Sequence, residues 1–320
     1  MLPVTTSRPS LSVVIPVYNG AASLSALCER LLAVLRPIGA PFEVILVNDG
    51  SRDRSWRVIQ DLAAGHPQIV GIDLMRNYGQ HNALLCGIHA ARHDVIVTMD
   101  DDLQQPPEEI PALLTKLDEG EGYDVVYGTP ARERHGFWRN ASSRLTKATL
   151  LAILGAEVAP LVSAFRAFRV TVKPAFADYH SPLPNVDVLL TWATTRFAAV
   201  SVRRDPRVDG SSHYRLRSLV RHTLNMLTGF SIVPLQLATL TGFVFTLFGI
   251  GVFVYVVGRY LVTGVSVPGF PFLASIIAIL SGAQLFALGI IGEYLGRMYL
   301  RAMARPAYLV RTTVDARSDR

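Results

Sequence analysis

The sequence predicts an α/β domain with a mostly parallel sheet, followed by an interfacial helix and two transmembrane helices. Three observations support this fold class. Short apolar runs alternate with longer segments of helical character over roughly the first two-thirds of the chain. Clusters of polar residues follow several of these runs directly. Between Thr223 and Gly296 only two residues are formally charged, Arg259 and Glu293, so this part of the chain suits the apolar interior of a bilayer.

Five apolar runs are typical of buried strands, and they cover residues 11–17, 42–48, 69–74, 95–99 and 124–127. The segments between them have helical character, and they cover residues 21–35, 53–64, 80–91 and 107–117. Strands that are apolar along their whole length are buried on both faces, and strand–helix alternation is typical of a parallel sheet covered by helices. We therefore expect one domain over residues 11–214, preceded by a flexible tail at residues 1–10.

An acidic triplet is the most informative motif of this domain. Asp100, Asp101 and Asp102 directly follow the strand-like run at residues 95–99. Unpaired carboxylates at this spacing repel one another and raise each other's pKa. A hard cation such as Mg²⁺ or Mn²⁺ removes the repulsion, and Mg²⁺ often binds one or two carboxylates together with substrate phosphates. The triplet therefore predicts a metal–diphosphate site; the alternative is a solvated acidic turn that caps the helix starting near residue 107.

Polar segments also end the first three strands. They are VYNG at residues 17–20, NDGS at residues 48–51 and RNYGQHN at residues 76–82. Each segment alone is an ordinary turn signal. Because ligands of open α/β sheets bind beyond the carboxyl ends of the strands, the convergence of these segments with the acidic triplet favours a nucleotide pocket.

Two uncharged stretches, residues 232–257 and 272–292, each reach the roughly 20 residues that a helix needs to cross a bilayer. A buried helix pair in a soluble protein is the alternative. Residues 258–271 are then a short outer loop. Basic residues flank both stretches, so the positive-inside rule places the large domain and both termini in the cytoplasm. The flanking residues are Arg215, Arg217, Arg221, Arg297, Arg301 and Arg305.

The segments beside the spans complete the domain plan. Residues 215–231 place leucines at helical spacing opposite basic residues, which predicts an amphipathic juxtamembrane helix; an ordinary helix lying against the domain is the alternative. Residues 293–320 are expected to be a cytoplasmic C-terminal segment. The net charge of +6 gathers near the spans, which favours membrane lipids rather than nucleic acid as partners. Cys28 and Cys86 lack metal-ligand spacing and are expected to be reduced core residues.

Several segments resemble a known enzyme family. VVIPVYNG, VNDGSRDRSW, MRNYGQHNALLCGI and MDDDLQQPPEEIP are similar to segments of the inverting family-two glycosyltransferases of the GT-A fold. DLQQPPEE together with the later GEYLGR narrows the resemblance to the polyprenyl-phosphate branch. That branch includes dolichyl-phosphate mannose synthases, bactoprenol glucosyltransferases and undecaprenyl-phosphate aminoarabinose transferases. The resemblance covers nearly the whole chain, and it implies Mg²⁺ or Mn²⁺ as cofactor and a homo-oligomer, a tetramer.

The resemblance also implies roles for particular residues. The residues implied to be catalytic are Asp100, Asp102 and Arg207, and those implied to bind the metal are Asp102 and Gln104. The nucleotide-sugar would be contacted by Pro16, Tyr18, Asn19, Asp49, Gly50, Ser51, Gly79, Gln80, Asp101 and Arg166. The acceptor phosphate would be held by Arg132, Arg134, Arg207, Ser212 and His213.

Three positions depart from the family pattern. Gly20 stands where many members have Glu, so a nucleotide contact can be lost. His213 stands where Lys is usual, which makes the positive charge there depend on pH. Pro160-Leu161 stands where relatives often carry Gly-Asp, which puts the donor-sugar specificity in question.

The leading functional interpretation is an inverting, metal-dependent transfer of a sugar to undecaprenyl phosphate at the cytoplasmic face of the bacterial inner membrane, serving cell-envelope glycans or lipid modification. The overall likeness favours a UDP-sugar as donor. The alternatives are a dolichyl-phosphate-mannose-type synthase that uses GDP-mannose and a non-catalytic nucleotide-sugar-binding membrane scaffold. A processive polysaccharide synthase is disfavoured, because the chain has no Gln-x-x-Arg-Trp motif.

Overall fold

The computed structural model describes residues 9–120, 122–130, 154–155, 157–177, 179, 184–205, 229–264, 269–303 and 305–316. The chain separates into two compact units. The first combines residues 1–214 with residues 304–320 and is called the sheet unit here. The second covers residues 215–303 and is called the hairpin unit.

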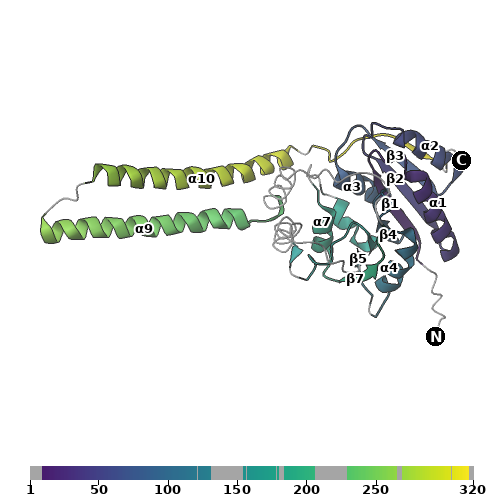
Figure 1. Cartoon of the computed structure of the whole chain (residues 1–320), viewed down its shortest axis with the longest axis horizontal. Helices are drawn as coiled ribbons and strands as arrows, with labels where there is room; N and C mark the ends of the chain where they lie inside the picture. The colour runs from purple at the N-terminus through teal and green to yellow at the C-terminus, as the bar shows by residue number, and fades with distance from the viewer. Residues whose placement is uncertain are drawn as a thin grey trace. The chain divides into compact units, whose positions relative to one another are not determined.

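The sheet unit is built on one eight-stranded sheet (Figure 1). Its strands are β1 Leu11–Val17, β2 Phe42–Asn48, β3 Ile69–Leu74, β4 Val95–Thr98, β5 Val125–Pro130, β6 Arg166–Arg169, β7 Phe197–Val202 and β8 Val310–Asp315. They lie in the order β7-β5-β6-β4-β1-β2-β3-β8. Strands β1 to β4 run parallel to one another, as do β5 and β7, whereas β6 and β8 run antiparallel to their neighbours.

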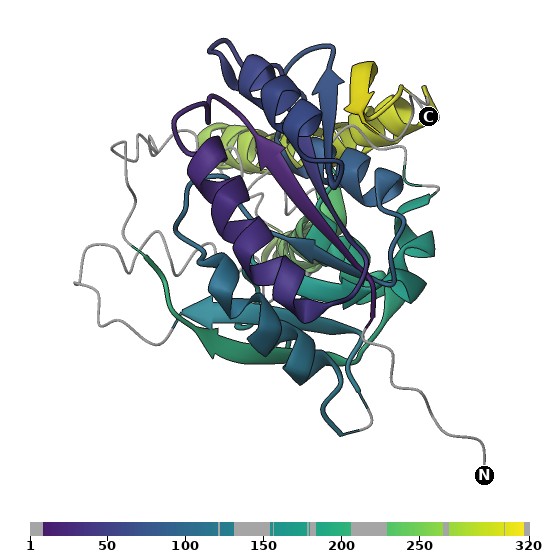
Figure 2. The ribbon, with the colours of Figure 1, turned by 90° about the vertical axis from the view of Figure 1, so that its right-hand side faces the viewer.

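Helices cover both faces of this sheet (Figure 2). The helices are α1 Leu24–Leu35, α2 Ser55–Gly65, α3 Gln80–Ala90, α4 Ile110–Leu117, α6 Pro174–Ala177 and α7 Val186–Ala193. Three 3₁₀ turns are η1 Arg36–Ile38, η2 Pro107–Glu109 and η3 Val170–Val172. Residues of α1, α2 and α4 belong to one apolar core, and residues of α3, α6 and α7 belong to a second core on the other face.

Strand β1 shows why the central strands carry apolar side chains on both faces. Val13 and Ile15 pack in the core of α1, α2 and α4, whereas Val14 packs in the core of α3. All three side chains are fully buried, because successive residues of a strand point to opposite faces. Each such side chain stabilises the fold by about 1.5–3 kcal/mol through removal of apolar surface from water.

The structure confirms the predicted α/β fold with a mostly parallel sheet. Strands β1, β2 and β3 occupy the predicted ranges, while β4 ends one residue earlier and β5 extends to Pro130. Strands β6, β7 and β8 were not predicted. Strand β6 has the sequence RAFR, so its apolar pattern is too short and too charged to predict a buried strand.

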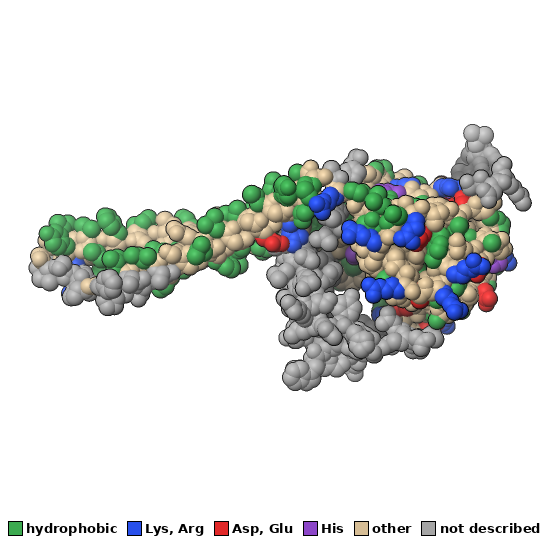
Figure 3. All heavy atoms as spheres, turned by 90° about the horizontal axis from the view of Figure 1, so that it is seen from above, with side chains coloured by type: hydrophobic (Ala, Val, Ile, Leu, Met, Phe, Trp, Pro, Cys, Tyr) green, Lys and Arg blue, Asp and Glu red, His purple; other side chains and the backbone are tan. Residues whose placement is uncertain are grey.

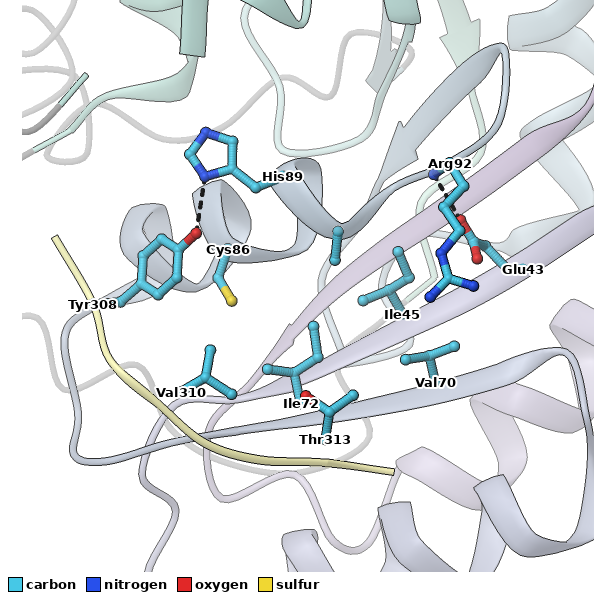
Figure 4. Close-up of a pocket in the computed structure, with 11 residues that line it drawn as sticks. Glu43, Ile45, Val70, Ile72, Cys86, His89, Arg92, Tyr308, Val310 and Thr313 are labelled. Atoms are coloured by element: carbon cyan, nitrogen blue, oxygen red, sulfur yellow. Dashed lines mark hydrogen bonds between the residues drawn. The ribbon is translucent and has the colours of Figure 1, made fainter. Parts of the chain in front are cut away.

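The C-terminal segment returns to the sheet unit and extends it. Strand β8 pairs antiparallel with β3, and Arg311 reaches the buried Asp73 at 3.2 Å. Just before the strand, the Tyr308 hydroxyl lies 2.8 Å from His89 Nδ1 of α3 (Figure 4). A cavity of about 240 Å³ lies between this segment and α3, and Cys86 is among its lining residues. Cys28 and Cys86 are both buried and free, as predicted.

The hairpin unit contains two long helices, α9 Val233–Thr263 and α10 Phe270–Ala302. Gly264 ends α9 in the left-handed conformation, with φ of +63°. Large apolar side chains cover the hairpin (Figure 3) and are exposed, such as Phe253 at 67%. By length and composition α9 and α10 are candidate membrane spans, in agreement with the prediction. Residues 206–228, and with them most of the expected juxtamembrane helix, lie outside the described residues.

Candidate active site

A cavity of about 270 Å³ lies at the carboxyl ends of β1, β2 and β4. It is lined by Pro16, Val17, Tyr18, Asp49, Asn77, Gly79, Gln80, Asp100, Asp101 and Asp102. All but Val17 and Asn77 belong to the predicted site. The parallel strands thus bring the predicted segments to one edge of the sheet, where open α/β sheets bind ligands.

Asp49 shapes one wall of this cavity. Its carboxylate is almost fully buried and accepts N–H hydrogen bonds from Tyr78 at 2.6 Å and Gly79 at 2.9 Å. Burial raises the pKa of Asp49, and the two hydrogen bonds oppose that rise. Gly50 has φ of +64°, and a Cβ there would lie 2.4 Å from the nitrogen of Asn77. Asp49 and Gly50 therefore fix the loop between β3 and α3.

Asn19 and Ser51 tie the loops that follow β1 and β2 to each other. The Asn19 N–H donates to Ser51 Oγ at 3.0 Å, and Asn19 Oδ1 accepts the Arg52 N–H at 2.8 Å. Asn19 has φ of +55°, a conformation that Asn adopts more readily than most residues. Asn19, Gly50 and Ser51 are not lining residues; in the structure they hold the loops that carry Tyr18 and Asp49.

Two glutamines orient Asp100. Gln80 Nε2 donates to Asp100 Oδ1 at 2.7 Å, and Gln105 Nε2 lies 3.3 Å from Oδ2. Gln105 Oε1 also accepts the Asp100 N–H at 2.9 Å. Burial, together with the nearby charge of Asp102, raises the pKa of Asp100 to about 6. Gln105 was not among the predicted site residues, although it lies in the same acidic motif.

Asp101 points toward the loop after β1. Its carboxylate is hydrogen-bonded to the backbone of Tyr18, but its buried Oδ2 has no hydrogen-bond partner among the described residues. Burial, together with the charges of Asp100 and Asp102, raises the pKa of Asp101 to about 6. A Cβ on Gly20 would lie 2.2 Å from Asp101 Oδ2. Gly20, one of the departures from the family pattern, therefore makes room for this carboxylate.

Asp102 and Gln104 form a pair beside the cavity. Gln104 Nε2 donates to Asp102 Oδ2 at 2.6 Å, and the Gln104 N–H lies 3.2 Å from Asp102 Oδ1. The side-chain oxygen of Gln104 accepts two hydrogen bonds from Arg204, from Nε at 3.0 Å and from Nη2 at 2.6 Å. Arg204 follows β7 and was not predicted as a site residue, because no local pattern indicated that strand.

The chemistry of these side chains fits a divalent cation. The raised pKa values of Asp100 and Asp101, and the unpartnered Asp101 Oδ2, indicate excess negative charge that a cation would relieve. In the described part of the chain no group of three His, Cys, Asp or Glu side chains could hold a metal ion by itself. Asp102 and Gln104 would supply protein oxygens, and Mg²⁺ typically adds substrate phosphate oxygens to such a small set.

Arg166 lies in the core rather than on the cavity wall. It is 1% exposed and forms an ion pair with Asp187 at the start of α7. Its Nε donates to Thr98 Oγ1 at 2.9 Å, and the Tyr127 hydroxyl donates to Asp187 at 3.0 Å. The positive charge of Arg166 lowers the pKa of Asp100 and so opposes the effect of burial. Arg166 therefore supports the loop of residues 100–105, called the acidic loop here, electrostatically from inside the fold.

The predicted acceptor residues lie outside the described residues. They are Arg132, Arg134, Arg207, Ser212 and His213. Their assignment to the acceptor phosphate stays a prediction.

A family model described as glycosyl transferase family 2 matches residues 12–173. The chain belongs to this family. The sheet with its helices is GT-A-like, and the two candidate spans follow it in the chain.

The family 2 chain has curated relatives that match nearly its whole length. The undecaprenyl-phosphate 4-deoxy-4-formamido-L-arabinose transferase of Pectobacterium carotovorum is 36% identical over 311 residues, which cover 96% of this chain and 94% of that protein. The Shewanella sediminis protein of the same name is 38% identical over 305 residues, covering 94% and 91%. Among solved structures, the Mycobacterium tuberculosis glucosyl-3-phosphoglycerate synthase in complex with Mn²⁺, UDP and phosphoglyceric acid is 21% identical, with a TM-score of 0.49, covering 69% of this chain and 78% of that chain.

Proposed function

We propose that this glycosyltransferase moves a sugar from a UDP-sugar to a polyprenyl phosphate, such as undecaprenyl phosphate, at the cytoplasmic face of the inner membrane. One observation carries the proposal. A polar cavity lined by four aspartates at the ends of parallel strands occurs in one chain with two candidate membrane spans. Relatives that share this whole length are named as undecaprenyl-phosphate sugar transferases.

The order in which the chain passes through the two units supports the proposed membrane orientation. Helices α9 and α10 leave the sheet unit and return to it, because β8 belongs to the same sheet as the strands that precede α9. An open sheet cannot cross the hydrocarbon of a bilayer, since its unpaired edge groups would be exposed to lipid. Both ends of the hairpin must then face one compartment, and the basic flanks favour the cytoplasm.

The proposed reaction is a direct displacement. An oxygen of the acceptor phosphate attacks the anomeric carbon of the donor sugar, and the bond from that carbon to the diphosphate oxygen breaks. The products are a polyprenyl-phosphate sugar and a nucleoside diphosphate, with inversion at the anomeric carbon. The acceptor phosphate is an anion near neutral pH, so no general base is needed. The site must instead stabilise two neighbouring anionic groups.

The residues of the cavity suit this task. Tyr18 and the loop held by Asp49 line the side proposed for the nucleoside. Asp100, oriented by Gln80, is placed to accept hydrogen bonds from sugar or ribose hydroxyls. Asp102 with Gln104 would hold a divalent cation, which when bound supplies Lewis-acid stabilisation of the leaving diphosphate.

The test is a transfer assay with the purified full-length protein and undecaprenyl phosphate. Donors should include UDP-linked hexoses, UDP-4-deoxy-4-formamido-L-arabinose and GDP-mannose, and mass spectrometry should identify the lipid product. We expect product from a UDP-sugar, and loss of at least about a hundredfold in rate for Asp102→Asn, as for loss of a charge-stabilising group. Asp61→Asn, on the exposed side of α2, is the matched control and should keep the parental rate.

Two outcomes would redirect the proposal. Product from GDP-mannose alone would favour the dolichyl-phosphate-mannose type of synthase. UDP binding without lipid product from any donor would favour the non-catalytic scaffold.

A further inference from the structure

We infer that Arg204 competes with the divalent cation for the side-chain oxygen of Gln104, and so couples cation binding to the arrival of the donor diphosphate. The inference rests on the proposed metal-dependent function, and it concerns a residue that the sequence pattern did not mark. Its basis is a set of hydrogen bonds that leave the Gln104 amide turned away from the geometry of a metal ligand.

Both lone pairs of the Gln104 side-chain oxygen are in use. Arg204 donates to this one atom from Nε at 3.0 Å and from Nη2 at 2.6 Å, and an amide oxygen has two acceptor sites. The Gln104 amide nitrogen meanwhile donates to Asp102 Oδ2 at 2.6 Å. The amide thus presents its nitrogen to Asp102, whereas a cation shared by Asp102 and Gln104 requires the amide oxygen.

A cation and the Arg204 guanidinium cannot occupy this oxygen together. A metal–oxygen bond of Mg²⁺ is only about 2.0–2.1 Å long, so both positive groups would meet around a single atom. The guanidinium stays protonated at every pH at which the protein is folded. It cannot withdraw by losing its charge, so it has to move.

The Arg204 side chain can move while the backbone that follows β7 stays in place. The Asp205 N–H donates to the backbone oxygen of Gln104 at 3.0 Å, and the Asp205 carboxylate lies 3.4 Å from Arg30. These contacts hold the chain after β7 against the acidic loop independently of the guanidinium. Arg204 itself is exposed, so its side chain has solvent to move into.

The donor diphosphate provides the new partner for Arg204. Guanidinium groups bind phosphate oxygens with two parallel, charge-assisted hydrogen bonds, which replace the two bonds to Gln104. A cation alone must displace Arg204 without such a replacement and binds weakly. A cation that arrives with a nucleoside diphosphate binds more tightly, and by linkage the nucleotide binds more tightly with the cation.

The test measures Mn²⁺ binding rather than activity. Purified full-length parent, Arg204→Ala and Arg203→Ala proteins are titrated with Mn²⁺, with and without UDP, and free Mn²⁺ is followed by electron paramagnetic resonance. For Arg204→Ala we expect Mn²⁺ alone to bind about three- to tenfold tighter than to the parent, the range expected for the net contribution of one typical hydrogen bond. The gain in Mn²⁺ affinity that UDP produces should shrink by a similar factor.

Arg203→Ala is the matched control for general loss of positive charge. Arg203 neighbours Arg204 in the chain, its side chain is 62% exposed, and it reaches Asp205 at 3.3 Å. This variant should bind Mn²⁺ like the parent. An equal gain in both variants would indicate a general electrostatic effect and would overturn the competition.

The remaining outcomes separate this inference from the proposed function. Unchanged or weaker Mn²⁺ binding by Arg204→Ala, with lipid product still formed by the parent, would overturn the inference alone. No Mn²⁺ binding by the parent in the presence of UDP would overturn both the inference and the metal dependence of the reaction.

Discussion

The sheet unit and the hairpin unit use the same apolar residue types in opposite ways. Leu46 of β2 is fully buried, whereas Leu261 of α9 is 76% exposed. The strands bury side chains on both faces of the sheet against covering helices, and the hairpin displays apolar side chains along its length (Figure 3). A hairpin that is apolar and exposed suits a lipid environment. Apolar content alone therefore does not show whether a segment packs in a protein core or lies in lipid.

The two units also treat charge differently. The sheet unit encloses the Arg166–Asp187 ion pair almost completely, with side-chain exposures of 2% and 10%. The described ion pair of the hairpin unit, Arg297–Glu293 at 2.8 Å, leaves Glu293 54% exposed. It joins positions one helical turn apart. A buried pair is costly to break, whereas an exposed helical pair contributes little.

The largest expected effect is therefore at the buried ion pair. Asp187→Ala should lower the free energy of unfolding by about 3–5 kcal/mol, because it leaves the Arg166 charge buried without a partner. Glu293→Ala should change it by less than about 1 kcal/mol. Urea unfolding in detergent, followed by tryptophan fluorescence, measures both, since all three tryptophans lie in the sheet unit. Similar losses for the two variants would break the contrast between the units.

The next effect compares one residue type in the two environments. Leu46→Ala should cost about 2–5 kcal/mol, because it leaves a cavity in a packed core. Leu261→Ala should leave the urea midpoint of the sheet unit unchanged, because its side chain packs against no core of the protein. A shift of the midpoint by Leu261→Ala would show that the hairpin contributes to the stability of the sheet.

The acidic loop predicts a pH dependence of stability. The pKa of Asp101 is raised from 3.8 to about 6, so between these values the folded protein holds a proton that the unfolded chain has released. The free energy of unfolding then falls as the pH rises from about 4 to about 6. Asp101→Asn removes this contribution, so from pH 5 to pH 7 the variant should gain on the order of 1 kcal/mol relative to the parent.

The measurement is urea unfolding of both proteins at pH 5 and pH 7 with a chelator present. Saturating Mn²⁺ and UDP should reduce the difference, because a nearby cation lowers a carboxyl pKa. A variant that tracks the parent at both pH values would show that Asp101 does not titrate in this range.

The smallest effect on stability is expected for single cysteine variants. Thiol labelling of these variants tests the proposed orientation. Burial raises the pKa of Cys28 and of Cys86 to about 12, so both thiols should stay unlabelled by maleimide at pH 7.5 until the protein is unfolded. Because the two native thiols do not react, Ser266→Cys should be labelled by an impermeant reagent in intact cells, and Ser7→Cys should not. Labelling of Ser7→Cys alone would reverse the proposed topology.

The sequence by itself determined the elements whose signals are local. Strand β1 is apolar except for Ser12, and its range was predicted to the residue. The same holds for β2 and β3, and the positions of Asp49 and Asp100 at strand ends followed from these strands. The two candidate spans were also predicted, because a lack of charge is a property of continuous sequence.

Only the tertiary structure decided which side chains meet across long sequence separations. Nothing in the local sequence indicates that Arg166 is buried. Strand β6 nevertheless places it against Asp187, where the ion pair compensates its charge. Arg204 reaches Gln104 only because β7 pairs with β5 and ends beside the acidic loop. Strand β8 joins β3 after the chain has passed through the hairpin. These contacts depend on strand pairing between distant segments. The stability of a strand depends on the neighbours against which it packs, so the local sequence pattern does not reveal the pairing.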